Sequence, residues 1–223
     1  YIPTLLEVQK VVRKPIVKLS EIDRIKQKLR EYSEEVNSGK SSFSTLARLY
    51  SEDTRTALNG GEYGFVAKTS LENEFARILF DMPNNKRVSP IIQSEEGYHI
   101  VQIIEKRGDL INFRHILLRP KVSDEALETE VIKLDSIAGQ ITSGALSFED
   151  AVAKYSQDED TSNSNGLLVN ANYQSTYSGS SFFPLEELPQ DISREVANLK
   201  VGDVSRAFVM INDKGNREVL IVK

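Results

Sequence analysis

The apolar residues in the first half of the chain follow two different spacings. Where they crowd together over a few positions the pattern is typical of short strands, and where they recur every three or four positions it predicts amphipathic helices. The expected elements are strands over 6–12, 88–92 and 98–104 and helices over 19–38, 43–50 and 71–79. This order of strand, helices and strands predicts an antiparallel sheet with helices packed on it, which is an α+β fold.

The second half of the chain repeats the first at a fixed offset of 105 residues, the distance from Ser42 to Ser147. The longest echo pairs SFSTLARLYSED (42–53) with SFEDAVAKYSQD (147–158). The identities in register are Pro15, Gly39, Phe43, Tyr50, Ser51, Asp53 and Gly61 with Pro120, Gly144, Phe148, Tyr155, Ser156, Asp158 and Gly166. A period of this length indicates duplication of a whole domain rather than a solenoid. We therefore expect two tandem domains, 1–108 and 109–223.

One segment of the second half has no counterpart in the first. The offset between matching serines grows from 105 (Ser51 and Ser156) to 116 (Ser89 and Ser205), which locates an insertion at about 167–183. The insertion is rich in Ser, Tyr and Asn, and long loops in compact domains are usually functional or mobile. We expect an exposed, mobile segment near the ligand groove of the second domain.

Composition and charge exclude several classes of function. The chain is 39% hydrophobic and 27% charged, as in ordinary globular domains, and no apolar run approaches the roughly 18 residues of a membrane span. Its lack of cysteine excludes disulfides, cysteine nucleophiles and thiolate metal sites. A net charge of −5 without a concentrated basic patch argues against nucleic-acid binding. Because the chain begins at Tyr1 instead of methionine, we expect it to be a fragment or a processed chain.

The chain has two histidines, His99 and His115, and both fall in expected strands. The alternation of side chains along each strand places both imidazoles on the apolar, inward face. An isolated inward histidine is most often a hydrogen-bonded core residue, and this pair lacks the spacing of a metal-ligand set. From the residues alone, a core role and a site role both stay open.

An ordered set of motifs resembles the parvulin (rotamase, PpiC-type) family of peptidyl-prolyl isomerases. In the first half these are FSTLARLYSED (43–53), GGEYG (60–64), Phe75, VSP (88–90) and GYHI (97–100). In the second half they are FRHIL (113–117), Phe148, YSQD (155–158), Gly166 and VGDVS (201–205). The resemblance covers essentially the whole chain, once per half. It implies two parvulin-like domains, no cofactor and no metal.

The family's reaction is rotation about the peptide bond that precedes proline. The barrier to this rotation is about 18–20 kcal/mol, because the planar amide is stabilised by resonance. No covalent step is required, so a site needs only to hold the proline and favour the twisted amide over the planar one. The resemblance implies two buried histidines, one on the first strand and one on the last, a nearby Cys or Asp, and three apolar residues that grip the proline.

These roles carry over to named positions in each half. The first domain has Asp53 and His99, with Tyr63, Leu71 and Phe75 as the apolar grip, and Lys10 where the first-strand histidine is expected. The second has His115 and Asp158, with Leu168, Leu188 and Ile192 as the grip, and Leu220 where the last-strand histidine is expected. Each domain is therefore expected to keep one histidine, and Lys10→His is expected to restore the pair in the first. A structural reading competes for the aspartates, which can bond their own backbone at a helix end, and for Leu71 and Phe75, which fit a helix core.

Two functions follow from the resemblance. The first is a peptidyl-prolyl cis-trans isomerase and foldase that acts on unfolded or folding polypeptides, outer-membrane or secreted proteins among them, in the bacterial periplasm. The second is a non-catalytic peptide-binding chaperone module that retains the parvulin fold. The absent histidines at Lys10 and Leu220 favour the second function, whereas Asp53, Phe75 and His99 favour the first.

Overall fold

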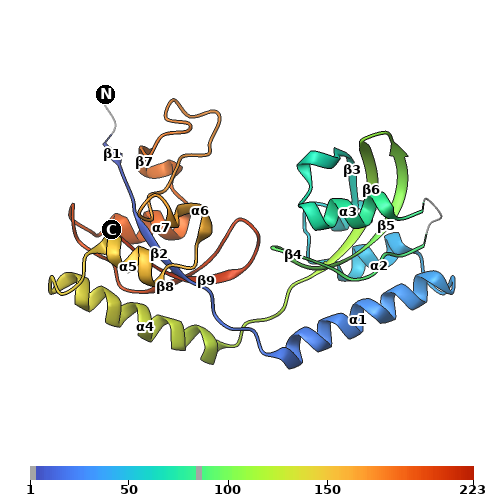
Figure 1. Cartoon of the computed structure of the whole chain (residues 1–223), viewed down its shortest axis with the longest axis horizontal. Helices are drawn as coiled ribbons and strands as arrows, with labels where there is room; N and C mark the ends of the chain where they lie inside the picture. Colours follow the sequence, from blue (N-terminus) through green and yellow to red (C-terminus); the bar gives the residue numbers. More distant parts are fainter. Residues whose placement is uncertain (1–3, 84–86) are drawn as a thin grey trace. The chain divides into compact units, whose positions relative to one another are not determined.

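The computed structural model describes residues 4–83 and 87–223, and it divides the chain into two compact units (Figure 1). One unit is continuous in sequence, residues 17–121, and is called the continuous unit below. The other joins the chain up to Ile16 with residues 122–223 and is called the split unit. Both are antiparallel sheets with helices packed on them, so the expected α+β fold class is confirmed.

The continuous unit is built on a four-stranded sheet in the order β3-β6-β5-β4. Its strands are β3 (Glu62–Ala67), β4 (Ile92–Ser94), β5 (Gly97–Arg107) and β6 (Leu110–Leu118), and its helices are α1 (Leu19–Asn37), α2 (Phe43–Tyr50) and α3 (Asn73–Asp81), with short 3-10 turns η1 (Ala57–Asn59) and η2 (Lys68–Ser70). Helices α1 and α2 share a core with Tyr98, Ile100 and Ile116, whereas α3 shares one with Val101 and Phe113. Since successive side chains of a strand point to opposite faces, β5 and β6 are buried on both sides.

The split unit is built on a three-stranded sheet in the order β2-β9-β8. Its strands are β2 (Lys10–Arg13), β8 (Phe208–Ile211) and β9 (Arg217–Val222), its helices are α4 (Asp124–Thr142), α5 (Phe148–Tyr155), α6 (Glu159–Ser162) and α7 (Gln190–Val196), and β1 (Leu5–Leu6), β7 (Phe183–Pro184) and η3 (Leu185–Glu187) complete it. Helices α4 and α5 share a core with Val219 and Ile221, on one face of the sheet. Ile192 of α7 shares a core with Leu220 and Val222, on the other.

The opening strand of each sequence repeat has been exchanged between the two units. Strand β2 comes before α1 in the chain but pairs with β9, and β6 comes after the expected boundary at 108 but lies between β3 and β5 (Figure 1). The compact units therefore differ from the expected halves 1–108 and 109–223. A cut at 108 would remove a central strand from the larger sheet, because β6 pairs along most of its length with both of its neighbours.

The strand registers show that the two sheets are built alike. His115 lies opposite Val101 in one sheet, as Lys10 lies opposite Val222 in the other. The serine that follows α2, Ser51, accepts a hydrogen bond from the amide of Leu117 at 3.2 Å, and Ser156 accepts one from the amide of Val12 at 3.2 Å. The positions of β2 and β6 thus correspond at the same offset of 105 residues as the sequence repeat.

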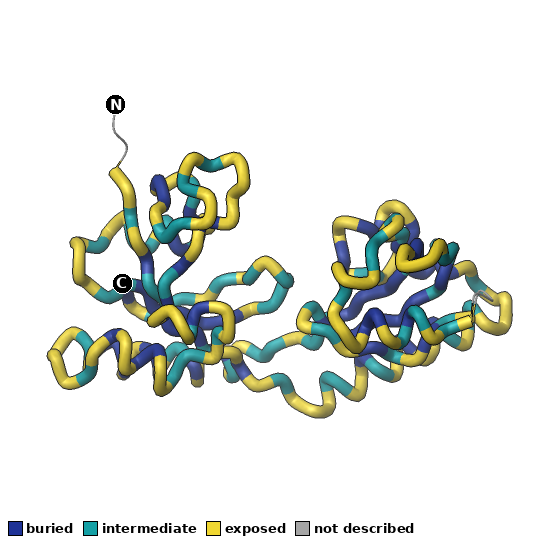
Figure 2. The backbone as a smooth tube through the Cα atoms, turned by 45° about the horizontal axis from the view of Figure 1, so that its top comes forward, coloured by how far each residue is buried: buried dark blue, intermediate teal, exposed yellow. Residues whose placement is uncertain are grey.

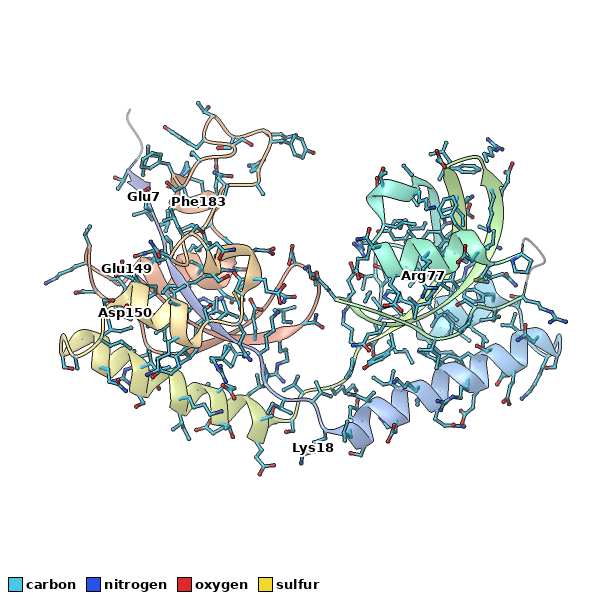
Figure 3. All side chains as sticks on the ribbon, viewed as in Figure 1. Glu7, Lys18, Arg77, Glu149, Asp150 and Phe183 are labelled. Carbon is cyan, nitrogen blue, oxygen red and sulfur yellow. The ribbon has the colours of Figure 1, made fainter. Side chains whose placement is uncertain are left out.

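The insertion at 167–183 is a largely exposed loop that contains one buried polar side chain, Asn170. Most of its residues are exposed (Figure 2), but Asn170 is only 1% exposed. The side-chain amide of Asn170 donates to the carboxylate of Glu187 at 2.6 Å, and its backbone pairs with Ser180 and Gly179 at 2.8 and 2.7 Å. At the base of the loop Leu6 pairs with Phe183, which lies close to Glu7 in Figure 3.

No helix in the described part of the chain is both long and apolar enough to cross a bilayer.

Candidate active site

The two histidines lie side by side in the continuous unit. His99 is on β5 and His115 is on the neighbouring strand β6, and both side chains are almost fully buried. Their rings are nearly parallel, with centroids 5.3 Å apart, and their Nδ1 atoms are 3.1 Å apart. The expectation that each domain keeps a single histidine is therefore wrong. It assumed that β6 stays with its own repeat, whereas the exchanged strand carries His115 to His99.

A line of hydrogen bonds runs through both rings. Nε2 of His115 is 2.8 Å from Oδ2 of Asp53, and the same oxygen accepts the hydroxyl of Thr56 at 2.9 Å. At the other end, Nε2 of His99 is 2.6 Å from the hydroxyl of Ser94. Asp53, Thr56 and both histidines are buried, and Ser94 is partly exposed. The order Asp53–His115–His99–Ser94 is called the histidine relay below.

The hydrogen-bond geometry fixes most of the protons in the relay. Burial, reinforced by the charge field of His115 and Arg119, lowers the pKa of His99 to about 3, so this ring is neutral at ordinary pH. An ionised Asp53 can only accept, which assigns a hydrogen to Nε2 of His115. Two nitrogens 3.1 Å apart share one hydrogen, so one Nδ1 donates to the other. These tautomers are assigned from the network of partners.

Asp53 is held as an anion although it is buried. Burial by itself raises the pKa of Asp53, but hydrogen bonds from His115, Arg55 and Thr56 outweigh that effect and leave the pKa well below its usual range. Nε of Arg55 donates to Oδ1 of Asp53 at 2.7 Å, and its Nη2 reaches both carboxylate oxygens of Glu96 at 2.9–3.0 Å. Arg55 therefore ties the loop after α2 to the turn that precedes His99.

Glycine at position 61 lets the loop approach strand β6 at the histidine. The carbonyl of Gly61 accepts the amide of His115 at 2.9 Å, and its φ of +77° belongs to the left-handed region. A Cβ at this position would lie 2.3 Å from the carbonyl oxygen of His115. Gly61 of the GG pair therefore permits the close backbone contact with β6 that positions the imidazole of His115.

Aromatic side chains surround the relay. Phe75 meets the ring of His99 edge-on at 5.2 Å, and Tyr63 meets that of His115 edge-on at 5.5 Å. Leu71 packs against the same core as Phe75. Tyr63 is 40% exposed and Phe75 only 7%, so Tyr63 lies nearer to solvent. The structure thus brings together Tyr63, Leu71, Phe75, Asp53, His99 and His115 in one unit.

Three further residues at this site were missed from the sequence. Phe113 stacks on Tyr63 with centroids 5.2 Å apart, Thr56 bonds Asp53, and Ser94 ends the relay. A signal existed for Phe113, because it precedes His115 by two positions and so shares its strand face. Thr56 lies in a polar loop and Ser94 is the last residue of β4, next to a polar turn, and in such segments the sequence pattern does not distinguish one hydroxyl from another.

Comparison with known families agrees with this geometry. The PPIC-type PPIase domain of the rotamase family matches twice, over residues 6–105 and 115–213. The chain belongs to this family. It is also 36% identical over 135 residues to the Chaperone SurA of Escherichia coli O6:H1 and to that of Shigella flexneri, a match covering 56% of this chain and 30% of each relative. The Chaperone SurA of Salmonella choleraesuis is 35% identical over 144 residues, 60% of this chain and 32% of the relative. The chain thus spans about a third of the length of these curated relatives.

The two PPIC-type matches follow the order of the sequence, whereas the compact units follow the exchanged strands. The first match contains Lys10, and the second begins at His115. In the structure Lys10 and His115 have each joined the sheet of the other repeat. The tandem parvulin architecture therefore holds, and each parvulin unit is completed by the opening strand of the other repeat.

The split parvulin unit has no histidine relay. At the position of His115 it has Lys10, whose Nζ is 2.9 Å from Oδ2 of Asp158, and at the position of His99 it has Leu220, which is fully buried. Burial raises the pKa of Asp158, but hydrogen bonds from Thr161 and Lys10 outweigh it and the pKa is lowered. Asp158 is thus paired with an ammonium and not with His115.

The expected apolar grip of the split unit lies in its core. The exposed fractions of Leu168, Leu188 and Ile192 are 9%, 5% and 2%, and all three pack in one cluster with Leu220 and Phe183. The aromatic rings that flank the relay in the continuous unit are replaced here by aliphatic side chains. Among the described residues, no group of three or more His, Asp or Glu side chains is placed to hold a metal ion.

Proposed function

We propose that this parvulin is a peptidyl-prolyl cis-trans isomerase whose turnover resides in the continuous unit. The observation that carries the proposal is the histidine relay, with its two buried rings 3.1 Å apart at Nδ1 and flanked by Phe75 and Tyr63. A relay bonded at both ends holds the rings in one orientation, which is the preorganisation that a binding site for a strained state requires.

The relay fits a reaction that exchanges no proton. As the amide twists it loses resonance, so the twisted amide differs in polarity from the planar one. A neutral His99 offers an apolar ring face with a fixed dipole, and Phe75 and Tyr63 offer surface for the proline ring. Asp53 keeps the ring of His115 in its orientation through the hydrogen bond to Nε2, and it makes no covalent bond to the substrate.

The substrates proposed for the whole protein are unfolded or folding polypeptides that contain proline, including outer-membrane or secreted proteins. Similarity to proteins named Chaperone SurA supports this class of client. The same similarity and the parvulin resemblance support a place in the bacterial periplasm.

A second function, a non-catalytic polypeptide-binding chaperone module, is proposed for the split unit. Its support is the Lys10–Asp158 ion pair and the buried Leu220, which replace the two imidazoles. The exposed apolar side chains of its loop, Val169 at 58% and Tyr173 at 87%, offer surface for an unfolded chain.

The isomerase proposal is tested with a matched pair of variants, Asp53→Asn and Asp158→Asn. Turnover is measured by exchange NMR on a short proline peptide, which needs no coupled protease. We expect Asp53→Asn to lower kcat/KM by at least about tenfold, since a hydrogen bond to a charged group contributes about 1.5–3 kcal/mol. Asp158→Asn should leave turnover unchanged. If the unmodified protein has no turnover but binds the peptide, the isomerase proposal fails and the chaperone function is favoured for the protein.

A second matched pair, Phe75→Ala and Ile192→Ala, tests where the peptide binds. An aromatic side chain can bury about 150–250 Å² of surface. We expect Phe75→Ala to weaken peptide binding in a titration followed by NMR shifts, and Ile192→Ala to leave the affinity for the same short peptide unchanged. Equal weakening by both variants would place peptide binding in both units.

A further inference from the structure

Strands β2 and β6 occupy equivalent positions beside β9 and β5, although β6 is the longer strand and also pairs with β3. They have the same register against β9 and β5, and the linkers that follow them, residues 14–18 and 119–123, are of equal length. A second arrangement is therefore open to the chain, in which each strand joins the helices of its own repeat. That arrangement would place Lys10 beside His99 and leave His115 beside Leu220, so the relay would not form.

One position on the two strands distinguishes the arrangements by charge. Arg13 on β2 donates from Nε to Oε2 of Glu130 at 2.8 Å and from Nη1 to the carbonyl of Tyr155 at 3.2 Å. The Glu130 side chain is only 3% exposed, and Nζ of Lys133 pairs with its other carboxylate oxygen at 2.7 Å. Glu130 is a carboxylate on the core side of α4, and burial is tolerated because Arg13 and Lys133 pair with it.

The equivalent position in the continuous unit is entirely apolar. Leu118 on β6 corresponds to Arg13, and Ile25 on α1 corresponds to Glu130, each at the offset of 105 residues. Leu118 and Ile25 are buried in the same core cluster, with exposed fractions of 7% and 2%. The charged pair and the apolar pair thus occupy the same place in the two units.

A second position distinguishes the arrangements by volume. Phe113 on β6 stacks on Tyr63, whereas its equivalent Val8, two residues before β2, meets the smaller Leu168, whose amide donates to the Val8 carbonyl at 2.9 Å. Returning each strand to its own repeat would leave a cavity beside Tyr63 and overfill the space at Leu168. Both changes are unfavourable in a packed core.

We propose that the Arg13–Glu130 pair, set against the apolar pair Leu118 and Ile25, determines which strand joins which sheet and so assembles the histidine relay. In the other arrangement the guanidinium of Arg13 would face Ile25 with no carboxylate, and Glu130 would face Leu118 and keep only Lys133 as its partner. Removing one partner of a buried ion pair is strongly unfavourable. The other arrangement is therefore disfavoured in both units, by Arg13 beside Ile25 in one and by Glu130 beside Leu118 in the other. Arg13 and Glu130 are then positioning residues for a site in which neither takes part.

Because the chain has no cysteine, engineered disulfides report the arrangement directly. Gln102 lies opposite Arg114 in the observed sheet, and its equivalent Lys223 exchanges backbone hydrogen bonds with Gln9 at 3.0 Å. Gln102→Cys with Arg114→Cys therefore crosslinks the exchanged arrangement. Gln102→Cys with Gln9→Cys crosslinks the other one. Both disulfides are assayed by mass spectrometry of the full chain, refolded under reducing conditions and then oxidised.

The decisive variant is Arg13→Leu/Glu130→Ile, which gives the split unit the apolar pair of the continuous unit and keeps its core filled. With the unmodified pair we expect the Gln102–Arg114 crosslink to be by far the more abundant of the two. In the variant, the ratio of the Gln9–Gln102 crosslink to the Gln102–Arg114 crosslink should rise at least about tenfold, since the buried-pair mismatch no longer opposes the second arrangement. An unchanged ratio overturns the proposal.

Two further variants separate strand choice from stability. Arg13→Leu/Leu118→Arg exchanges the strand residues alone and should make the Gln9–Gln102 crosslink the major one. Adding Ile25→Glu and Glu130→Ile restores both matches and should return the ratio of the unmodified protein. If the strand-swapped variant keeps the original crosslink, the proposal is also overturned. The crosslinks need no enzymatic readout, so their outcome is independent of whether the protein isomerises proline.

Discussion

In both units an aspartate three residues after the end of a helix accepts a hydrogen bond from a threonine hydroxyl and is paired with a side chain from the opening strand, but the strand side chains differ. Asp53 receives Thr56 and His115, whereas Asp158 receives Thr161 and Lys10. In the continuous unit the line of hydrogen bonds continues to a second ring, and in the split unit it stops, because the next position is Leu220. The aspartate and threonine therefore belong to the shared fold, whereas the two stacked rings occur only in the continuous unit.

The backbone supports are the parts that the two units share most closely. Gly166 meets the carbonyl of Lys10 just as Gly61 meets that of His115, since a Cβ on either glycine would lie 2.3 Å from that oxygen. Each glycine carbonyl also accepts the amide of the same strand residue, at 2.8 and 2.9 Å. The glycine and serine motifs thus indicate a parvulin sheet, and they are present both with the histidine relay and without it.

The largest expected effect is a difference in stability between two fragments of the chain, one cut at the bounds of the continuous unit and one cut at the end of the first sequence repeat. Fragment 17–121 should unfold in one cooperative transition, whereas fragment 1–108 should not fold, because it lacks β6. Four side chains of β6 are at most 1% exposed, namely Ile111, Phe113, Ile116 and Leu117. Each contributes about 1.5–3 kcal/mol, so the loss of about 6–12 kcal/mol rivals the stability of a whole domain. Urea unfolding followed by circular dichroism measures this.

The fragment result also tests the exchange itself. If fragment 1–108 unfolds cooperatively and fragment 17–121 does not, each repeat keeps its own opening strand in solution. The two fragments differ little in length, so the comparison isolates the strand that each contains.

Local structure followed from sequence patterns because helices are decided by nearby residues. The spacing of apolar residues gave α1, α2 and α3 to within about two residues, and the Ser42 and Ser147 caps recur at the expected helix starts. Strand alternation gave the inward histidines, which are buried, and the motifs gave the equivalence of Leu220 with His99, which the strand register supports.

The strand exchange did not follow from the sequence, because β2 and β6 satisfy the same pattern. The sheet that each strand joins is set by long-range contacts, and the Arg13–Glu130 pair that we propose as one of them joins residues 117 apart in the sequence. Subtracting one repeat from the other therefore assigned one histidine to each domain. Both segments do form strands, and what differs from the prediction is the strand that each one pairs with.

The next effect in size concerns acid stability, which should differ between the units. His99 has a pKa of about 3 in the folded protein and about 6.5 when unfolded, so between these values only the unfolded chain holds the proton. The free energy of unfolding should then fall as the pH falls, by up to about 1.4 kcal/mol per pH unit. Asp53 acts in the same direction at lower pH, since its depressed pKa gives stability that is present above about pH 4 and lost below it.

The matched control for this slope is His99→Leu, which installs the residue that the split unit has at this position. Urea titrations at pH 7, 6 and 5, followed by the NMR signals of the continuous unit, should show a flatter dependence in the variant. An equal slope in both proteins would mean that His99 does not govern the response to acid.

A smaller effect is expected in the loop at 167–183, which the continuous unit lacks. Amide hydrogen exchange should be slow at Asn170 and Gly179, whose amides bond Ser180 and Asn170, and fast in the exposed residues between them. Asn170→Ala should raise exchange at both protected sites, because the Glu187 carboxylate loses a bond and such losses cost about 1–3 kcal/mol. Uniform protection along the loop in the unmodified protein would show packing that the hydrogen bonds do not account for.

The smallest effect should come from rebuilding the relay in the split unit. Lys10→His alone should leave turnover unchanged, because the new ring would bond Asp158 but find Leu220 and no second imidazole beside it. Lys10→His/Leu220→His places two rings in the register of His115 and His99, above an Asp and Thr that are already present.

The rebuilt relay is assayed in an Asp53→Asn background, so that turnover of the continuous unit is low. We expect only a few-fold rise over that background, because Leu168 and Ile192 stand in place of the aromatic Tyr63 and Phe75 and supply less surface to the proline ring. Exchange NMR on a proline peptide measures the rise, with the Lys10→His single variant as control. If the single variant gains as much as the double, one imidazole beside an aspartate is sufficient, and the second ring is not what separates the two units.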